Sequence, residues 1–170
     1  DFPHIIVVDN GSDDGCATQT HIYLPRAQVL ALPRNLGFGA ANNRALAQVK
    51  TPYALLLNPD CEITPKAVAQ LMGTARQWPE AAIVAPQLLQ ASGKPDINYR
   101  WPHLYWHSRG PAVTAGPACV GFVCGAAMLL HMKEFGGQFF DERFFLYYED
   151  DDLCTRLFTH HKPMLIDPVA

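Results

Sequence analysis

Four consecutive acidic residues, Glu149 to Asp152, form the densest group of chemically active side chains in the sequence. They follow an aromatic run at residues 144–148 and precede Leu153 and Leu157, which are spaced as in a helix, so the charges belong to folded structure. Like charges this close together repel one another unless a cation, a hydrogen-bonding substrate or a helix N-terminus compensates. The pattern predicts a site in an enzyme that handles protons or metals.

Two further carboxylates follow residues that are typical of strands. The β-branched run at residues 4–8 leads to Asp9, and the apolar run at residues 53–57 stops at Asn58 and Asp60. In open α/β sheets, ligands bind at the carboxyl ends of the strands. With the acidic run, these residues place carboxylates at three positions, which suits transfer of a group from a nucleotide-activated donor. One carboxylate would bind the base or ribose, one would bind a divalent cation on the diphosphate, and one would act as a general base.

The rest of the sequence predicts the strands and helices that would position these carboxylates. Strands and helices alternate, which predicts an α/β fold with an open, mostly parallel twisted sheet and helices on both faces, Rossmann-like in character. Expected strands lie at residues 4–8, 53–57, 82–85, 122–130 and 164–166, with a hairpin at 88–99, and expected helices lie at 40–49, 64–78, 132–135 and from the acidic run to about residue 161. We expect one domain over residues 1–170, with a flexible loop at 100–118, where Pro, His, Trp and Gly show no sustained period.

Composition restricts the partners. The chain has 170 residues, 49% of them hydrophobic, and a net charge of -3, which suits one globular domain with a core. Lys and Arg are scattered singly, so neither binding to nucleic acid nor a polybasic membrane contact is indicated. Five cysteines without CxxC spacing support neither a disulfide framework nor a zinc site, and they fit a reducing cytoplasm. The longest apolar stretch is shorter than the roughly 20 residues of a membrane helix, so we expect a cytoplasmic protein with no integral membrane segment.

Asp9, Asp60 and the acidic run at residues 149–152 fall within motifs of the chain that resemble those of family 2 glycosyltransferases. There are four such motifs, and they are most similar to those of the rhamnosyltransferase-like branch. The motifs lie in the family's order at residues 7–12 (Val-Val-Asp-Asn-Gly-Ser), 34–43 (Arg-Asn-Leu-Gly-Phe-Gly-Ala-Ala-Asn-Asn), 55–60 (Leu-Leu-Leu-Asn-Pro-Asp) and 144–153 (Phe-Phe-Leu-Tyr-Tyr-Glu-Asp-Asp-Asp-Leu). The resemblance implies the GT-A fold, a nucleotide-diphosphate sugar as donor, Mg²⁺ or Mn²⁺ as cofactor, and inversion of the anomeric carbon.

The resemblance also implies roles for single residues. Asp150 is expected to be the catalytic base, with Glu149 supporting it, and Asp60 is expected to be the metal ligand. The residues expected to bind the nucleotide-sugar are Asp9, Asn10, Asn35, Gly37, Asn42, Asn58 and Asp60, and those expected on the acceptor side are Gly125, Ala126 and Asp152.

The chemistry of transfer agrees with a single base. A diphosphate leaves readily once a cation offsets its charge, so a protein acid is not obligatory, unlike in the two-carboxylate hydrolysis of glycosides. Asp150 would take the proton from an acceptor hydroxyl while that oxygen attacks the sugar C1 opposite the departing diphosphate. A single displacement of this kind inverts the anomeric carbon.

The partners implied are a dTDP- or UDP-sugar donor, with rhamnose as the leading candidate, and a hydroxyl acceptor that is a saccharide or is linked to a lipid. Such a protein would serve cell-surface polysaccharide or glycolipid synthesis, peripherally at the inner membrane face. Relative to the family, the chain is expected to lack the first strand–helix unit, and Asn58 replaces the first acid of the metal motif. These departures leave open whether this stretch transfers sugar by itself, and an exposed sheet edge would favour self-association.

Simpler interpretations also stay open. Asp9 and the step from Asn58 to Asp60 could be turn residues alone, and the acids after Asp150 could complement a helix dipole. A non-catalytic nucleotide-sugar-binding or interaction module is the main alternative function, and it would tolerate Asp150→Asn. A metal-dependent nucleotidyltransferase is a minor alternative, because the sequence has no glycine-rich, basic phosphate loop near its start.

Overall fold

The computed structural model describes residues 4–102 and 113–170, which form two compact units. Among the described residues, the first unit comprises residues 4–50 and 138–149, and the second comprises residues 51–102, 113–137 and 150–170. The expected domain over residues 1–170 therefore contains two separately packed parts, and each is described by itself.

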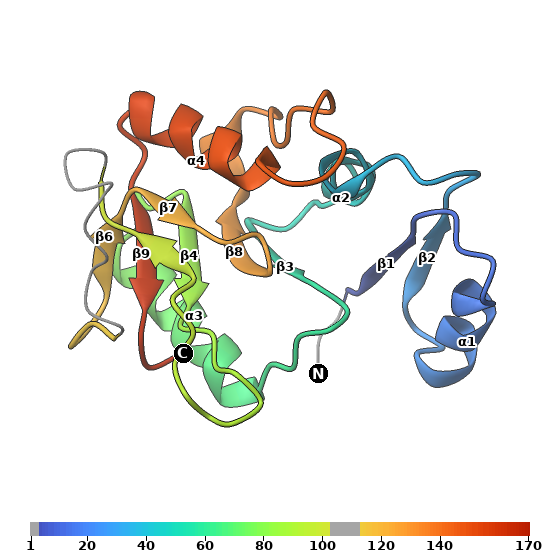
Figure 1. Ribbon diagram of the computed structural model, residues 1–170, viewed down its shortest axis with the longest axis horizontal. Coiled ribbons are helices and arrows are strands. Elements are labelled where there is room, and N and C mark those ends of the chain that lie inside the picture. The colour runs from blue at the N-terminus through green and yellow to red at the C-terminus, as the bar shows by residue number, and fades with distance from the viewer. Residues whose placement is uncertain (1–3, 103–112) are drawn as a thin grey trace. The chain divides into compact units, whose positions relative to one another are not determined.

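The first unit contains two short parallel strands, β1 (Ile6–Asp9) and β2 (Gln28–Ala31), with helix α1 (Cys16–Tyr23) between them in sequence (Figure 1). The sequence pattern predicts β1 but neither α1 nor β2. Helix α1 has no buried residue, so it lacks the apolar face that periodicity detects, and β2 has only four residues with both end residues exposed.

Helix α2 (Phe38–Leu46), predicted at residues 40–49, anchors the later segment of the first unit. Its small residues 39–41 are buried, which leaves room for residues 138–149 to pack closely. The side chain of Asn43 donates to the carbonyl of Phe140 (2.8 Å) and accepts from the backbone N–H of the same residue (3.0 Å). Two segments far apart in sequence are thus joined by one amide.

The second unit contains a mixed five-stranded sheet in the order β3-β8-β4-β9-β6. Its strands are β3 (Tyr53–Leu57), β4 (Ile83–Pro86), β6 (Ala118–Val120), β8 (Ala127–His131) and β9 (Met164–Asp167). Strands β4 and β9 pair in parallel, whereas β8 is antiparallel to both β3 and β4, and β6 is antiparallel to β9. Strands β3, β4 and β9 therefore run in the same direction, and β8 and β6 run in the opposite one. The sheet is mixed because β8 enters it without the crossover helix that a parallel connection needs.

A two-stranded ribbon, β5 (Tyr99–Arg100) and β7 (Phe122–Val123), precedes β8. The single strand predicted at residues 122–130 is consequently two strands, β7 and β8, separated by a turn at residues 124–126. This correction matters for function because the turn carries two of the predicted site residues. The loop predicted at 100–118 overlaps β5 and β6 at its two ends, and its residues 103–112 lie outside the described residues.

The hairpin predicted at residues 88–99 is reduced to one antiparallel bridge between Leu89 and Pro95. The side chain of Asn98 donates to the carbonyl of Pro86 (2.9 Å) and accepts from the N–H of Leu88 (3.3 Å). A buried amide therefore satisfies backbone groups that a longer strand ladder would have paired.

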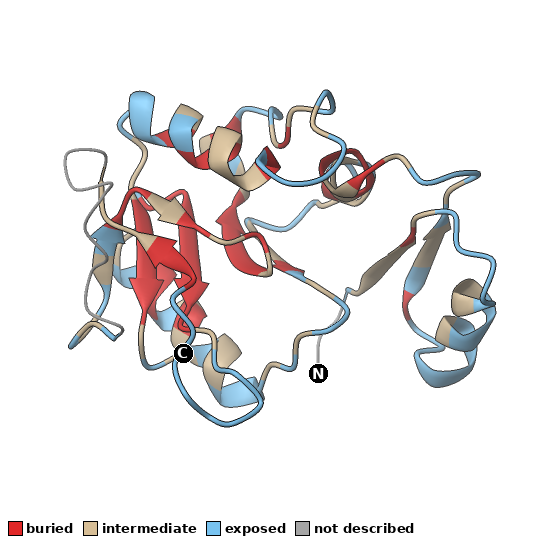
Figure 2. Cartoon of the chain, viewed as in Figure 1, coloured by how far each residue is buried: buried red, intermediate tan, exposed pale blue. Residues whose placement is uncertain are grey.

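Helix α3 (Pro65–Gln77), predicted from its cap and apolar spacing, packs on one face of this sheet (Figure 1). The Thr64 hydroxyl accepts from the N–H of Ala67 (3.1 Å), which caps the first turn. The buried cluster between helix and sheet consists of Leu71, Ala75, Ala81, Val84, Leu129 and Leu165. Strand residues of the opposite face, including Ile83, Met128, Leu130, Met164 and Ile166, are buried as well, so the sheet is covered on both sides (Figure 2).

Two further helices follow β8 in the chain: the short 3₁₀ helix η2 (Met132–Phe135) and α4 (Glu149–Thr159), which starts on the acidic run as predicted. Leu153, Cys154 and Leu157 of α4 are buried. Within residues 4–102 and 113–170, no helix combines the length and the hydropathy that crossing a bilayer requires.

Candidate active site

The carboxylate of Asp150 is held by two backbone N–H groups. Its Oδ2 accepts from Gly125 (3.1 Å) in the turn between β7 and β8, and its Oδ1 accepts from Asp151 (2.9 Å). Hydrogen bonds to an ionised acceptor are stronger than those between neutral groups. The orientation of the predicted base is therefore set by the turn and by the start of α4.

The end of β3 is joined to the same turn. The last residue of β3, Leu57, is paired with Ala127, and the N–H of Asn58 donates to the carbonyl of Ala126 (2.9 Å). The N–H of Cys61 then donates to the carbonyl of Asn58 (3.1 Å), which closes a tight loop with Asp60 exposed within it. Within the second unit, the structure thus brings predicted residues of the donor, acceptor and catalytic sets to one turn.

Two arginines pair with the acids that follow Asp150. Arg100 of β5 forms an ion pair with Asp151, and Arg156 of α4 pairs with Asp152 at 2.8 Å. Arg100 also lies over the ring of Phe122, with 3.9 Å between its guanidinium carbon and the ring centroid. Sequence reasoning missed Arg100, because it lies 51 positions before its partner and no local pattern marks it.

In the first unit, Asp9 ends β1 with its side chain buried and turned onto the loop that follows. Its Oδ1 accepts from the N–H of Ser12 (2.9 Å). The hydrogen bond from the Ser12 backbone, followed by one from the Ser12 side chain, lowers the pKa of Asp9 below its usual range. Asp9 therefore stays a carboxylate at neutral pH, available to a polar ligand.

A side-chain brace joins the loop after β1 to the loop before α2. Asn10 accepts from the N–H of Leu36 (2.9 Å) and donates to Asn35 Oδ1 (2.9 Å) and to the carbonyl of Gly37 (3.2 Å). Asn35 Oδ1 also accepts from the N–H of Gly37 (2.9 Å). Three residues predicted to bind the nucleotide-sugar, Asn10, Asn35 and Gly37, therefore lie together in the first unit.

Gly37 sits where only glycine fits. Its φ of 87° lies in the left-handed region, and a Cβ there would overlap the carbonyl of Phe145. That carbonyl accepts from the N–H of Phe38 (3.0 Å) at the start of α2. The glycine thus lets the aromatic run approach the backbone of the loop before α2 within the first unit.

The other predicted residues of this unit have local partners. The amide nitrogen of Asn42 donates to the carbonyl of Phe38 (3.0 Å), one turn earlier in α2. Glu149 is buried beside Gly39, where a Cβ would come 3.7 Å from that of Glu149 and 2.8 Å from that of Phe140. These contacts are compatible with a supporting role for Glu149 and with a structural role for Asn42.

Asp9 belongs to the first unit, and Asp60 and Asp150 belong to the second. The meeting of all three carboxylates in one cleft stays a prediction. The geometry establishes one polar assembly within each unit, at the Asn10 brace in the first and at the turn beside Asp150 in the second.

A model of the family described as glycosyl transferase family 2 matches residues 1–134. The chain belongs to glycosyltransferase family 2. The resemblance to this family is thereby confirmed, and the motifs at residues 7–12, 34–43 and 55–60 lie within the matched region. The matched region includes Asp9 and Asp60 and ends before the acidic run.

Two curated relatives are 28% identical to this family 2 chain over 184 residues. Both are named N-acetylglucosaminyl-diphospho-decaprenol L-rhamnosyltransferase and come from Mycobacterium tuberculosis, strains CDC 1551 / Oshkosh and ATCC 25618 / H37Rv. The alignments cover 90% of this chain and 60% of each relative, so the chain spans about 60% of the length of the relatives it matches.

Solved structures agree with the predicted GT-A fold. GalNAc-T7 with UDP, GalNAc and Mn²⁺ aligns with a TM-score of 0.74 at 12% identity, over 98% of this chain and 36% of that one. TarS 1–349 from S. aureus with UDP aligns with a TM-score of 0.68 at 15% identity, over 96% and 48%. At these identities the likeness establishes the fold of the family 2 chain and nothing finer.

The end of β3 in this family 2 chain fits a divalent cation that its substrate helps to hold. In the two described stretches, no three His, Cys, Asp or Glu side chains lie close enough together to form a metal site. Mg²⁺ is commonly bound by one or two carboxylates together with substrate phosphates and water. The exposed carboxylate of Asp60, two residues after Asn58, suits that mode of binding.

The cysteines beside Asp150 are not nucleophiles. Burial raises the pKa of the Cys124 thiol, and it raises the pKa of Cys154 to about 12. Both thiols therefore remain protonated at neutral pH, and a protonated thiol is a poor nucleophile. Of Cys124, Cys154 and Asp150, the carboxylate is the group with the chemistry of a base at neutral pH.

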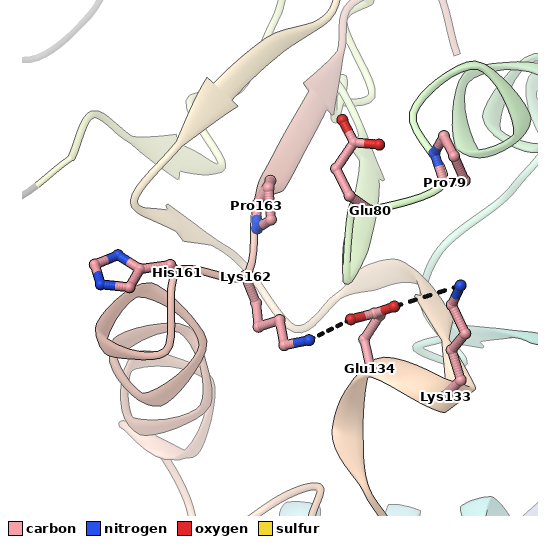
Figure 3. Close-up of a pocket in the computed structure, with 7 residues that line it drawn as sticks. All are labelled: Pro79, Glu80, Lys133, Glu134, His161, Lys162 and Pro163. Atoms are coloured by element: carbon pink, nitrogen blue, oxygen red, sulfur yellow. Dashed lines mark hydrogen bonds and ion pairs between the residues drawn. The ribbon is translucent and has the colours of Figure 1, made fainter.

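An open pocket of about 450 Å³ lies where β4 and β9 begin, away from the strand ends that carry Asp60 (Figure 3). Its lining residues are Pro79, Glu80, Lys133, Glu134, His161, Lys162 and Pro163. Glu134 pairs there with Lys162 (2.5 Å) and Lys133 (3.6 Å). The charges compensate one another and no predicted site residue lines the pocket, so it is not the candidate active site of the family 2 chain.

Proposed function

We propose that this chain forms the catalytic part of an inverting glycosyltransferase that moves a sugar from a nucleotide-diphosphate sugar to a hydroxyl acceptor. The observation that carries the proposal is the carboxylate of Asp150, held by the N–H groups of Gly125 and Asp151. A general base must be oriented toward the proton it removes. Membership of family 2 supports the same class of reaction.

In the proposed reaction, Asp150 accepts the proton of the acceptor hydroxyl while the hydroxyl oxygen bonds to the sugar C1. The bond from C1 to the diphosphate oxygen breaks at the same time, and its electron pair leaves with the diphosphate. Each oxygen of Asp150 accepts one backbone hydrogen bond and retains a further lone pair. The carboxylate can therefore take the proton without losing its orientation.

Asp60 would hold the divalent cation, Mg²⁺ or Mn²⁺, in this scheme. Such a cation supplies positive charge against the leaving diphosphate. The structural likeness to GalNAc-T7, whose structure contains UDP and Mn²⁺, supports the choice. The loop that carries Asp60 is tied to the turn of Asp150 through Asn58 and Ala126, which suits two groups acting on one donor.

The first unit would bind the nucleotide. Asp9 can accept hydrogen bonds from a base N–H or a ribose hydroxyl, because its lowered pKa keeps it ionised. The brace of Asn10 and Asn35 holds the loop before α2, and Gly37 allows a ligand to approach the backbone there. Asn42 is proposed to contact the nucleotide end of the donor as well.

The sugar and the acceptor are proposed from the relatives. The M. tuberculosis proteins are named for an L-rhamnosyl group and for a diphospho-decaprenol compound. A rhamnose donor, as the dTDP- or UDP-sugar, and a lipid-linked acceptor therefore fit this chain well. Acting on such an acceptor, the protein would work at the inner face of the membrane in cell-surface polysaccharide or glycolipid synthesis.

The experiment that tests the proposal is Asp150→Asn in the intact protein. Asparagine keeps the shape and the two acceptor contacts in part but cannot take a proton, so transfer is expected to fall about 10²- to 10⁴-fold. Donor affinity, measured as the rise in melting temperature with UDP- and dTDP-sugars with and without Mn²⁺, is expected to change little.

Glu80→Gln is a matched control, since it removes an exposed carboxylate of the same unit that lies before the start of β4 and should leave transfer unchanged. If the chain is a non-catalytic binding module, the donor would stabilise both the wild type and Asp150→Asn, and neither of them would transfer sugar. Equal loss of donor binding and transfer in Asp150→Asn would indicate structural damage and would count against the role of Asp150 as a base.

A further inference from the structure

Tyr147 and Tyr148 have a backbone conformation that disfavours tyrosine. They are consecutive, and both have a φ of 68°, which lies in the left-handed region. There the Cβ of an L-residue crowds the carbonyl oxygen that follows it, so glycine is the residue best suited to such positions and asparagine is tolerated better than most. A chain that needed only the turn would therefore be more stable with asparagine than with tyrosine at these two positions.

Packing does not account for the two tyrosines either. Tyr147 is 71% exposed and Tyr148 is 69% exposed, and Phe145 and Leu146 before them are exposed as well. Apolar surface that stays in water adds nothing to the hydrophobic stabilisation of the fold. Local conformation and burial both leave the choice of tyrosine unexplained, and residues that break local rules in this way are concentrated at functional sites.

The backbone on both sides of the two tyrosines is fixed within the first unit. Before them, the carbonyl of Phe145 accepts from the N–H of Phe38 (3.0 Å). After them, Glu149 is buried at the start of α4. Residues 146–148 connect these two points, which explains how the left-handed conformation is retained. Because the backbone is already ordered, less conformational entropy is lost when a ligand binds to the rings.

The covalent chain keeps the tyrosines near the proposed base. Asp150 follows Tyr148 by two positions, so peptide geometry alone limits the separation of their Cα atoms to about 7.6 Å. The part of an acceptor that must lie at Asp150 is the sugar ring whose hydroxyl gives up its proton. A tyrosine side chain this close to the base can reach that ring, whereas a lipid chain beyond the diphosphate of the acceptor would lie farther from the base.

We propose that Tyr147 and Tyr148 determine acceptor specificity by binding the sugar ring of the acceptor against their aromatic faces. The inference rests on the proposed function, and it names the part of the acceptor that is recognised. The C–H groups of a pyranose ring are attracted by the negative face of an aromatic ring, and the contact removes apolar surface of both rings from water. The same contact orients the ring, so that its reacting hydroxyl is presented to the base.

The first test measures acceptor binding without requiring transfer. The probe is N-acetylglucosaminyl-diphospho-geraniol, a short-chain form of the compound for which the relatives are named, titrated calorimetrically into the intact protein in the presence of UDP. Tyr147→Ala and Tyr148→Ala should each weaken its binding about tenfold, whereas the two Tyr→Phe variants keep the aromatic face and should bind it within about twofold of the wild type. The affinity for UDP itself should not change.

The second test separates recognition from stability. Tyr147→Asn and Tyr148→Asn remove a ring and also relieve the left-handed backbone, so each should weaken acceptor binding as alanine does while raising the melting temperature by about 2–4 °C. A purely structural role for the tyrosines predicts a lower melting temperature in both variants, and that result would overturn the inference. Tyr23→Asn, which replaces a tyrosine 77% exposed at the end of α1, is the matched control and should leave acceptor affinity unchanged.

Geranyl diphosphate, which lacks the sugar, distinguishes the two parts of the acceptor. Its binding should be the same in the wild type and in all the tyrosine variants, and a loss equal to that of the full probe would overturn the proposal in favour of a contact with the lipid. If the variants do not fold, saturation-transfer NMR on wild-type protein deuterated everywhere except at its tyrosines decides. Magnetisation must then reach the protons of the sugar ring, and its absence would overturn the inference. Tyrosine-dependent binding of the sugar in a protein that transfers nothing would uphold the binding site and count against the proposed function instead.

Discussion

The two units hold their polar residues in place by different means. In the second unit, Asp150 and Asn58 are anchored to a turn that leads into β8, whose residues Met128 and Leu130 are fully buried. In the first unit, Asn10 and Asn35 hold each other and the loop before α2, beside strands that are largely half-buried or exposed (Figure 2). The position of Asp150 thus depends on a packed core, whereas the residues proposed to bind the nucleotide depend on hydrogen bonds between side chains and loops.

The largest expected effect is on the core of the second unit. Leu130→Ala should lower the free energy of unfolding of that unit by about 2–5 kcal/mol, because a fully buried leucine leaves a cavity when it is truncated. Val7→Ala in the half-buried β1 should cost about 1 kcal/mol. Native-state hydrogen exchange, read at the amides of β4 and β8 and separately at those of β1 and β2, measures both. Equal losses from the two variants would remove the difference between the units.

A smaller effect is expected for the brace of Asn10 and Asn35, which is proposed to support nucleotide binding. Asn10→Ala removes hydrogen bonds to Leu36, Asn35 and Gly37, each worth about 1 kcal/mol, so the melting temperature should fall and the affinity for UDP or dTDP should fall about tenfold as well. Calorimetric titration measures the affinity. Asn43→Ala is the matched control, since that amide joins α2 to Phe140 and its loss should lower the melting temperature but not the affinity. The opposite pattern in the two variants would contradict the assignment of the brace to ligand binding.

The smallest effects are on acid stability, with one carboxylate in each unit. Hydrogen bonds from Ser12 lower the pKa of Asp9, and the hydrogen bond from Lys162 lowers the pKa of Glu134. A lowered pKa stabilises the folded state above the pH at which the unfolded chain's carboxyl titrates, and this contribution disappears as the pH falls through the lowered value. Ser12→Ala should therefore move the acid transition of the first unit slightly upward, and Lys162→Ala that of the second. Hydrogen exchange between pH 2 and 5 would show each shift, and a shift of both units by either variant would argue against their independence.

Part of the fold was predictable because it is local. The apolar run at residues 53–57 and the cap, proline and apolar spacing of residues 64–78 each specify their own element, and both elements are present as β3 and α3. Helix α1 and strand β2 were missed, because a helix without buried residues and a four-residue strand have too little pattern to detect. The strand predicted at 122–130 was wrong in its middle, since the hydrophobic run does not reveal that Gly125 turns away to contact Asp150.

The candidate site, like the fold, contains some residues that the sequence indicates and others that it does not. Asp9, Asp60 and Asp150 were chosen because each stands at a recognisable place in a motif, and their roles stay predictions. Arg100 could not be chosen, because an arginine two residues before a proline carries no signal of its own. Its position at the site arises from the pairing of β5 with β7 and from the packing of α4, which place it beside Asp151.

The sequence by itself determined the family, the alternation of strands and helices and the identity of the acids, since these depend on the order and spacing of residues along the chain. Only the tertiary structure decided which backbone groups orient Asp150, which cation pairs with Asp151 and which amides brace the loop before α2. The physical reason is that hydrogen bonds and ion pairs are contacts between atoms a few ångströms apart. The pairing of strands and the packing of helices, and not the distance between residues in the sequence, bring those atoms together.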